Sequence, residues 1–348
     1  MKKQAWLFAK VVTMYIGSVI GAGFASGQEI MQFFVLHGLD GIKGLLLMSV
    51  LFAYLGGYVM YLCTSLRSAS YKDVFIKLIG RQAGAVMDRL NLCILLGSLS
   101  VMMAGSAAVF KEQFGLPPAA GTVAVLCLTA LVLLSGLEGV LAATVVLVPL
   151  KFVAVTGIAL AVMCLDGWLF QPVPVDTVPG GVAGNWLVSA FLYVSYNMVV
   201  PVAALSSLGR IVPRRLGIAG GITGGLLLGL AVSLVALALW QHLPDLYGYQ
   251  IPMLYLAGRL GPGSRLLLAL LIWLAILTTA LAQAHGFASR LAAGSAAKYR
   301  IYGLGACLFA LPLSAAGFST MVRYLYPLFG GAGLILLLAI IAAPLAKK

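Results

Sequence analysis

Long apolar segments separated by short polar gaps make up almost the whole chain. A helix needs about 20 mainly apolar residues to cross a bilayer, because each residue adds about 1.5 Å along its axis. Cutting at the polar gaps gives about ten such segments, namely residues 5–35, 40–66, 87–110, 118–136, 138–165, 185–210, 216–241, 264–290, 300–316 and 318–345. The pattern predicts an all-α polytopic membrane protein with about ten transmembrane helices, in a single domain over residues 1–348.

The amino-acid composition indicates that most of the chain lies in lipid rather than in water. Hydrophobic residues make up 62% of the chain and charged residues 9%, against about 45–50% and about 25% in soluble domains. A soluble enzyme is therefore excluded, and the sequence contains no HExxH, Walker or GxSxG motif that would supply catalytic residues. The 5 cysteines lack CxxC spacing, so we expect neither a metal cluster nor a disulfide framework, and no bound cofactor.

The formal charge of +13 is explained by topology rather than by a nucleic-acid-binding surface. Most Lys and Arg residues lie in alternate gaps between the apolar segments, beginning with Lys2 and Lys3 and ending with Lys347 and Lys348. Under the positive-inside rule these gaps face the cytoplasm. We therefore expect a multi-pass protein of the plasma (inner) membrane with both termini cytoplasmic, in contact with lipid and with no nucleic-acid partner.

Two segments contain residues that disfavour a continuous helix. The first has Gly17, Gly21 and Gly23 near its midpoint, where each glycine costs about 1 kcal/mol of helix propensity. The sixth combines Asn197 with Pro201, which has no backbone N–H to donate. We interpret both segments as broken helices; for the glycines, close packing of two helices is the alternative explanation.

The two predicted breaks are five segments apart, which suggests an internal repeat. The chain then divides into a five-helix repeat over residues 5–165 and a second over residues 185–345. Because each repeat has an odd number of helices, the second enters the membrane in the opposite orientation. Discontinuous helices at corresponding positions of inverted repeats indicate a transporter site near the bilayer midplane.

Unusual polar groups gather at one depth if each segment is centred in the bilayer. The residues within about one helical turn of the midplane are Ile20, Lys151, Asn197, Thr278 and Thr279. Lys151 is too central for its ammonium to reach the surface, and burying it without a partner costs several kcal/mol. We therefore interpret Lys151 as functional. Ala275, Thr278 and Thr279 place one carbonyl and two hydroxyl oxygens on one helix face, as a small hard cation requires.

These motifs resemble a known architecture. The plan of five plus five helices with helices one and six broken resembles the LeuT fold, and Gly17-Ser18-Val19-Ile20-Gly21-Ala22-Gly23 is similar to the first-helix motif of the amino acid-polyamine-organocation (APC) superfamily. The longer string GSVIGAGFASGQEI is most similar to the YkvI-type bacterial membrane proteins. The resemblance covers the whole chain in architecture and a few short motifs in sequence.

The resemblance implies a substrate site at the two breaks. Backbone N–H groups after Gly21, at Ala22 and Gly23 and beside Phe24, would hold a substrate carboxylate at the positive end of a half-helix. In the sixth segment the pattern Phe-x-Tyr-x-Gly-x-Glu of the amino acid branch is matched by Phe191 to Asn197. The further substrate-binding residues implied are Tyr193, Ser195, Tyr196 and Asn197. Ser195 replaces Gly and Asn197 replaces Glu, which alters the space in the site and removes a charge.

The resemblance also implies two coupling schemes that compete for one place. In sodium symporters of this fold the matching cage would be Gly17, Ile20, Ala275, Thr278 and Thr279. In proton-coupled or ion-independent relatives a lysine of helix five fills that cage, and Lys151 matches its position. An ammonium and a sodium ion about 4 Å apart repel by about 4 kcal/mol at an effective dielectric constant of 20. We therefore favour Lys151 in place of sodium, with the proton as coupling ion.

Once the charges near the segment ends are assigned to the loops, Glu29 and Arg323 are the charged residues that remain inside the spans besides Lys151. Opposite charges at one depth on the outer side predict a gate closed by a bidentate ion pair. Alternatively, Glu29 attracts a cationic substrate, with aromatic rings from Tyr193, Tyr196, Tyr324 and Tyr326 around it.

Together these features predict a secondary transporter of a small polar organic solute, an amino acid or an amine, working by alternating access. The alternatives are a sodium-coupled symporter and a metal-ion transporter on the same fold. The metal-ion transporter is disfavoured because neither predicted break offers acidic or soft ligands. A membrane enzyme is disfavoured because no nucleophile and base converge at the midplane.

Overall fold

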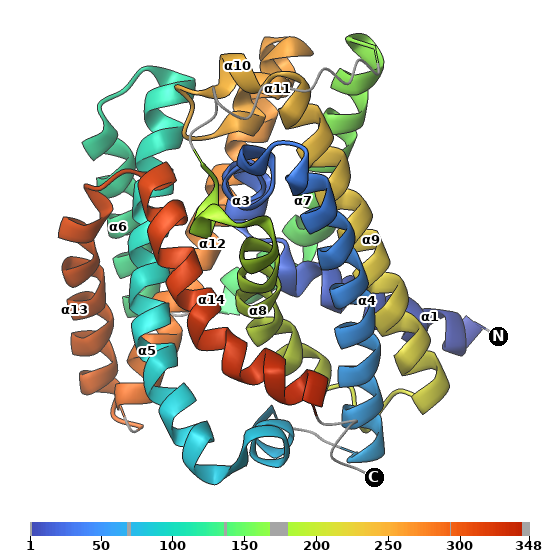
Figure 1. The fold of residues 1–348 in the computed structure, drawn as a ribbon. Helices are drawn as coiled ribbons and strands as arrows, with labels where there is room; N and C mark the ends of the chain where they lie inside the picture. Colours follow the sequence, from blue (N-terminus) through green and yellow to red (C-terminus); the bar gives the residue numbers. More distant parts are fainter. Residues whose placement is uncertain (1, 68–70, 136–137, 168–179, 293, 343–348) are drawn as a thin grey trace.

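The computed structural model describes residues 2–67, 71–135, 138–167, 180–292 and 294–342, and these residues form helices joined by turns, with no β-strand among them. The long helices run side by side as a bundle (Figure 1), and two short helices, α10 and α11, lie together at one end of it. In chain order the α-helices are α1 (Lys2–Val19), α2 (Ala22–Ser26), α3 (Gln28–Phe33), α4 (Asp40–Ser65), α5 (Tyr71–Phe114), α6 (Pro118–Ser135), α7 (Glu138–Leu165), α8 (Trp186–Ser206), α9 (Arg214–Gln241), α10 (Leu243–Leu246), α11 (Pro252–Arg259), α12 (Pro262–Ala292), α13 (Ala296–Ser314) and α14 (Phe318–Ala342). Two short 3-10 helices, η1 (Val35–His37) and η3 (Val182–Gly184), precede α4 and α8.

Six stretches of described helix are each long and apolar enough to cross a membrane alone. They are Asp40–Ser65, Arg89–Phe114, Leu147–Leu165, Trp186–Ser206, Arg214–Gln241 and Pro262–Ala292. The pair Ala296–Ser314 and Phe318–Ile335, bent by 113°, passes the same test together and brings the number to as many as seven. These stretches fall on the predicted segments from residue 40 onward, apart from 118–136. The full set of about ten spans and the division into repeats 5–165 and 185–345 stay predictions.

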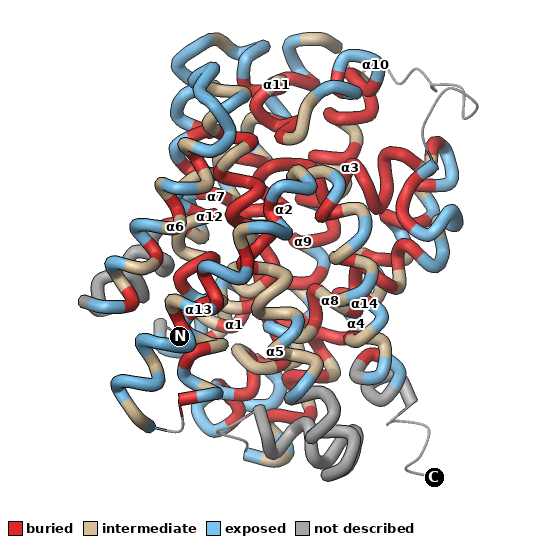
Figure 2. Tube along the Cα trace, turned by 90° about the vertical axis from the view of Figure 1, so that its left-hand side faces the viewer, coloured by how far each residue is buried: buried red, intermediate tan, exposed pale blue. Residues whose placement is uncertain are grey.

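Large apolar side chains cover the outside of the bundle. Four of them, Leu46, Val50, Ile301 and Leu328, are each 64–67% exposed. Figure 2 shows the buried residues along the middle of the bundle, around α2, α3 and α9, with exposed residues on its outside. Soluble proteins rarely expose large contiguous apolar surfaces. The distribution is therefore that of a chain whose outer surface faces lipid, as the sequence predicts.

The backbones of α4 and α9 approach each other closely at glycines. A Cβ atom added to Gly56 of α4 would lie 2.6 Å from the carbonyl oxygen of Gly221 on α9. One turn further on, a Cβ on Gly225 would lie 2.5 Å from the backbone nitrogen of Ala53. Any larger side chain at these positions would force the helices apart, so the glycines permit backbone-to-backbone packing over the length of the pair. Figure 1 shows α4 and α9 lying side by side.

The first apolar segment is divided into three helices. Helix α1 ends at Val19, and the N–H of Gly21 bonds to the carbonyl of Val19 at 2.9 Å instead of continuing the α-helical pattern. Gly21 is extended, with φ −92° and ψ −167°, before α2 begins. Gly27 then adopts φ 79°, a left-handed conformation that favours glycine, between α2 and α3. The chain thus leaves the helix at the glycine motif that the sequence singles out.

The prediction of a break in the sixth segment is wrong, because α8 runs without interruption. The polar side chains that suggest a break form bonds compatible with a helix. Asn197 donates through Nδ2 to the carbonyl of Tyr193, one turn back, at 3.0 Å. Ser195 donates through Oγ to the carbonyl of Gly330 on α14 at 2.7 Å. Pro201 lies inside the helix, as proline can in membrane helices when surrounding groups take over the backbone bonds. Ser195 and Asn197 therefore use their polar groups in packing.

Candidate functional site

The break between α1 and α2 exposes a backbone carbonyl to a buried lysine. In a continuous helix the Ile20 carbonyl would accept from the N–H four residues later, but the first bond of the new helix runs from Ala25 to Gly21 instead, at 3.2 Å. Lys151, on α7, is 4% exposed and donates through Nζ to the Ile20 oxygen at 3.4 Å. No ion pair to Lys151 occurs within the described ranges. The ammonium is therefore held at the break by a carbonyl dipole.

The other residues of the predicted sodium cage belong to α1 and α12. Gly17 permits α1 to approach α7, since a Cβ on it would lie 2.6 Å from Cγ1 of Val148. Helix α12 packs against both α2 and α7. Thr278 donates to the carbonyls of Leu274 at 2.9 Å and Ala275 at 3.1 Å. The Thr278 hydroxyl and the Ala275 carbonyl are thus engaged with each other inside α12, and Thr279 beside them is half-buried.

A buried carboxylate from α3 lies against α2, on the far side of the break from α1. Glu29, on α3, is 5% exposed. Its carboxylate group rests on Gly23 of α2: a Cβ added to Gly23 would lie 2.8 Å from Cγ of Glu29 and would overlap Oε1. Only glycine at position 23 leaves room for this carboxylate. The N–H of Gly23 is one of the first in α2, which have no acceptor within their own helix.

Tyrosines from α8 and α14 complete the surroundings of Glu29. Tyr196 donates its hydroxyl to Oε2 of Glu29, and the hydroxyl of Tyr326 is hydrogen-bonded to the same carboxylate. The two rings lie 5.1 Å apart between centroids. We call Gly23, Glu29, Tyr196 and Tyr326 the Glu29 cluster. It joins α2, α3, α8 and α14, so two helices from the second half of the chain meet the first broken segment here.

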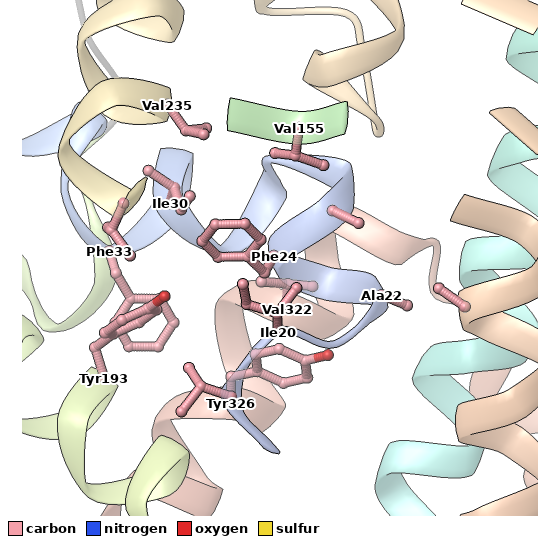
Figure 3. Close-up of a cluster of buried hydrophobic side chains, with 14 of the residues drawn as sticks. Ile20, Ala22, Phe24, Ile30, Phe33, Val155, Tyr193, Val235, Val322 and Tyr326 are labelled. Atoms are coloured by element: carbon pink, nitrogen blue, oxygen red, sulfur yellow. The ribbon is translucent and has the colours of Figure 1, made fainter. Parts of the chain in front are cut away.

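Further aromatic rings pack against this cluster. The ring of Tyr193 lies 5.8 Å from that of Tyr196 and 5.4 Å from that of Phe33. The Tyr193 hydroxyl is buried and has no hydrogen-bond partner in the described part of the chain. Figure 3 shows Phe33 above Tyr193, and Ile20 close to Phe24 with Tyr326 below them. Phe24, predicted at the substrate site, is fully buried in this core.

The structure does not bring Glu29 and Arg323 together, so the predicted outer latch is not formed. Arg323 donates through Nη2 to the carbonyl of Gly180 at 3.1 Å. Glu29 bonds to tyrosine hydroxyls instead, and no ion pair of either residue occurs in the described structure. Tyr324 is 64% exposed and lies on the outside of α14, away from the carboxylate. Of the rings predicted around Glu29, Tyr193, Tyr196 and Tyr326 are therefore present.

Sequence reasoning missed a charged cluster at the end of the bundle that carries α10 and α11. His242, at the end of α9, lies with Nε2 2.9 Å from Oδ2 of Asp166, at the end of α7. Arg259 of α11 donates to the other oxygen of Asp166. The hydrogen bond from Arg259, and secondarily that from His242, hold the pKa of Asp166 below its ordinary value. We call these three residues the Asp166 cluster.

The ring of His242 connects α9 to the end of α7. Its Nδ1 lies 3.0 Å from the carbonyl oxygen of Ala238, and its Nε2 faces the carboxylate of Asp166. Asp166 and His242 directly follow the predicted segments 138–165 and 216–241. Their position at segment ends on one membrane face was the signal available in the sequence.

A cavity of about 450 Å³ adjoins the Asp166 cluster. Its lining includes Tyr249, Tyr255, Arg259 and Arg265. Elsewhere, the described residues contain no group of three His, Cys, Asp or Glu side chains placed to hold a metal ion. Near the broken segment, the buried charged groups among the described residues are a lysine on one carbonyl and a carboxylate among tyrosines.

Comparison with known proteins identifies relatives over the full length. No family model matches the chain. It is 28% identical over 355 aligned positions to the uncharacterized membrane protein YkvI of Bacillus subtilis (strain 168), covering 100% of this chain and 98% of YkvI. It is also 28% identical to the uncharacterized protein YyaD of the same organism, over 97% of both chains.

Solved structures show a shared fold. MhsT in complex with L-phenylalanine superposes with a TM-score of 0.61 at 15% identity, over 95% of this chain and 94% of MhsT. A Na⁺-coupled sialic acid symporter in a substrate-bound outward-open state gives 0.59 at 12%, over 96% and 78%. A manganese transporter of Eremococcus coleocola gives 0.53 at 16%, over 96% and 76%. The chain is therefore a full-length homologue of the membrane protein YkvI, and its fold is the LeuT-type transporter fold rather than that of an enzyme.

Proposed function

We propose that the chain is a secondary active transporter that moves a small polar organic solute, an amino acid or an amine, across the bacterial plasma membrane. Alternating access by the two inverted repeats carries the solute, and a proton is the coupling ion. The observation that supports this most directly is the contact between the Lys151 ammonium and the Ile20 carbonyl at the helix break. The positive charge of the protonated lysine there takes the place of a sodium ion.

The neighbourhood of Lys151 supports the proton over sodium. A sodium ion held by the Ile20 carbonyl would lie about 4 Å from the ammonium, and the repulsion costs about 4 kcal/mol at an effective dielectric constant of 20. The oxygens that α12 would offer are partly engaged, because Thr278 already donates to the Ala275 carbonyl. Loss and gain of a proton at Lys151 changes the charge at the break without any metal ion.

A sodium-coupled symporter is the second candidate. The structure with a TM-score of 0.59 is described as a Na⁺-coupled symporter, and this chain has the residues for a similar cage in Gly17, Ile20, Ala275, Thr278 and Thr279. In that case Lys151 must leave the Ile20 carbonyl before sodium binds. Sodium would then stabilise the purified protein in the absence of any substrate.

A metal-ion transporter is a weaker candidate. One structural neighbour is described as a manganese transporter. Divalent manganese favours several carboxylate or carbonyl ligands, whereas the broken segment meets one carboxylate, Glu29, with tyrosine hydroxyls bonded to it. In the described part of the chain no second acidic or imidazole ligand joins it.

The proposed function is tested by ligand screening of the purified, full-length protein. Thermal stability is measured with panels of amino acids, amines and divalent metals, each with and without sodium, and hits are followed as uptake into proteoliposomes with an imposed pH gradient. We expect stabilisation by an amine or amino acid that does not require sodium, and accumulation driven by the pH gradient. Stabilisation by sodium alone would overturn proton coupling, and stabilisation only by metals would overturn the substrate class.

The orientation of the protein is part of the proposal. The positive-inside pattern places both termini in the cytoplasm. Single cysteines added at each end of a functional cysteine-free variant, labelled from outside intact cells with a membrane-impermeant reagent, check this directly. Labelling of either end from outside would contradict the orientation.

A further inference from the structure

The carboxylate of Glu29 lies beside Gly23, one of the two residues whose N–H groups were expected to hold a substrate carboxylate. The resemblance to amino acid transporters assigns the substrate carboxylate to the N–H groups at Ala22 and Gly23. In the structure, the side chain of Glu29 already lies on Gly23, with its Cγ 2.8 Å from where a Cβ would be. The space directly beside Gly23 is therefore filled by a carboxylate of the protein itself.

We infer that Glu29 substitutes for the substrate carboxylate, so that the transported solute is an organic amine without a carboxylate. Its ammonium group binds Glu29 beside the rings of Tyr196 and Tyr326. This inference rests on the proposed function and deepens it. The proposed function allows either an amino acid or an amine as the solute, and the inference selects the amine.

Electrostatics at Gly23 disfavours an amino acid. A substrate carboxylate at the Ala22 and Gly23 N–H groups would lie beside the Glu29 carboxylate, and like charges at close range in a buried site repel strongly. Lys151 does not relieve this repulsion from its present position. It binds the Ile20 carbonyl, and it forms no ion pair with Glu29 in the described residues.

The surroundings of Glu29 suit an ammonium group. The carboxylate accepts hydrogen bonds from Tyr196 and Tyr326 and has no cationic partner in the parts of the chain that the structure describes. The tyrosine hydroxyls hold the carboxylate in place. The rings of Tyr196 and Tyr326, which pack against each other with centroids 5.1 Å apart, and the ring of Tyr193 beside them provide aromatic surface of the kind on which amines bind. A bound amine supplies the missing positive charge.

The test compares amines with the amino acids that differ from them only by a carboxylate. Tyramine with tyrosine, cadaverine with lysine and agmatine with arginine form three such pairs. Dissociation constants are measured on the full-length wild-type protein and on Glu29→Gln, which keeps the shape of the side chain. Asp40→Asn removes the same charge from an exposed residue that pairs with Lys43, and serves as the matched control.

We expect the wild type to bind at least one amine at least about tenfold more tightly than its amino acid, a difference of 1.4 kcal/mol. Glu29→Gln should lose that preference, and Asp40→Asn should keep it. Glu29→Ala empties the space beside Gly23, so its preference should move toward the amino acid of the same pair. If Glu29→Ala does not fold, the Gln variant alone decides.

Two results overturn the inference while leaving the proposed function intact. One is tighter binding of the amino acid by the wild type, and the other is an unchanged amine preference in Glu29→Gln. If folded wild-type protein binds no amine and no amino acid across the whole screening panel, the proposed function fails, and the inference fails with it. The two failures are thus distinguished by whether the wild type binds any amine or amino acid at all.

Discussion

Lys151 and Ile20, 131 residues apart in the chain, meet through a hydrogen bond of 3.4 Å between the lysine Nζ and the isoleucine carbonyl oxygen. The contact exists because α1 stops one residue earlier, which leaves that carbonyl without a helical donor. A charged side chain on α7 is thereby linked to the backbone of the broken segment. A change in the charge of Lys151 acts directly on the segment that also carries Gly23.

Replacing Lys151 with Ala should abolish concentrative uptake driven by a pH gradient, because the positive charge at the break is lost. Downhill exchange of substrate should persist, since the Glu29 cluster is unchanged. Proteoliposome uptake with and without the gradient measures both. Lys43→Ala, at a side chain that is 63% exposed, is the control. Gradient-driven accumulation that survives in Lys151→Ala would rule out the proposed coupling.

Replacing Thr278 with Val should have little effect on transport if the lysine occupies the cage. The hydroxyl bonds to carbonyls of its own helix, and loss of such a bond costs about 1 kcal/mol or less. Thr156→Val on α7 removes an equivalent bond, to the Phe152 carbonyl at 2.6 Å, and calibrates the stability change. Transport kinetics and melting temperature are compared for both variants. A much larger transport defect in Thr278→Val, with sodium dependence in the wild type, would favour the sodium cage.

The glycines of the first-segment motif should differ sharply in tolerance. A Cβ on Gly21 meets no atom within 4 Å, and φ −92° is open to any residue. A Cβ on Gly23 collides with Glu29. Gly21→Ala should therefore retain transport and stability. Gly23→Ala should lose transport and about 1–3 kcal/mol of stability, as overpacking does. Combining Gly23→Ala with Glu29→Ala should recover stability but not amine transport. If Gly21→Ala and Gly23→Ala had the same stability and the same transport rate, the carboxylate would not lie on Gly23.

Acid should weaken the connection between α7, α9 and α11. The folded-state pKa of Asp166 is depressed, chiefly by its bond to Arg259, so its stabilising contribution is complete above the unfolded value of about 3.9. That contribution is lost as pH falls through the folded pKa. Asp166→Asn should lower the melting temperature at neutral pH and flatten its dependence between about pH 5 and pH 3. Melting curves across this range, with Asp40→Asn as control, check the sign. A steeper acid dependence in Asp166→Asn would contradict it.

The sequence was informative wherever one residue type carries a large energetic penalty in lipid. The glycines near Ile20 and the ammonium of Lys151 are of this kind, and the structure places the ammonium in contact with the carbonyl of Ile20. The pattern in the sixth segment misled because Asn197 and Pro201 are costly only if their polar groups lack partners. Asn197 has its partner within α8 itself, and the nearby Ser195 has one on α14, which no single segment reveals.

Pairings between segments were the least predictable part of the candidate site. Glu29 and Arg323 are opposite charges at similar depth, yet Glu29 bonds to tyrosines and Arg323 to the Gly180 carbonyl. Opposite charge and depth do not specify which faces of two helices meet. The Asp166 cluster was missed for the opposite reason: its residues lie at segment ends, where charges are common and attract no attention.

The glycine contact between α4 and α9 limits which parts of the protein can move. Two helices whose backbones touch at Gly56 and Gly221 have no side-chain layer between them that could be sheared or compressed. They should therefore move together as one rigid body. During the proposed alternating access, we expect the bending to occur between Val19 and Gln28, where the helix is interrupted at Gly21 and at Gly27. Glycine thus holds one pair of helices in direct backbone contact, and in another segment it provides the points at which the chain bends.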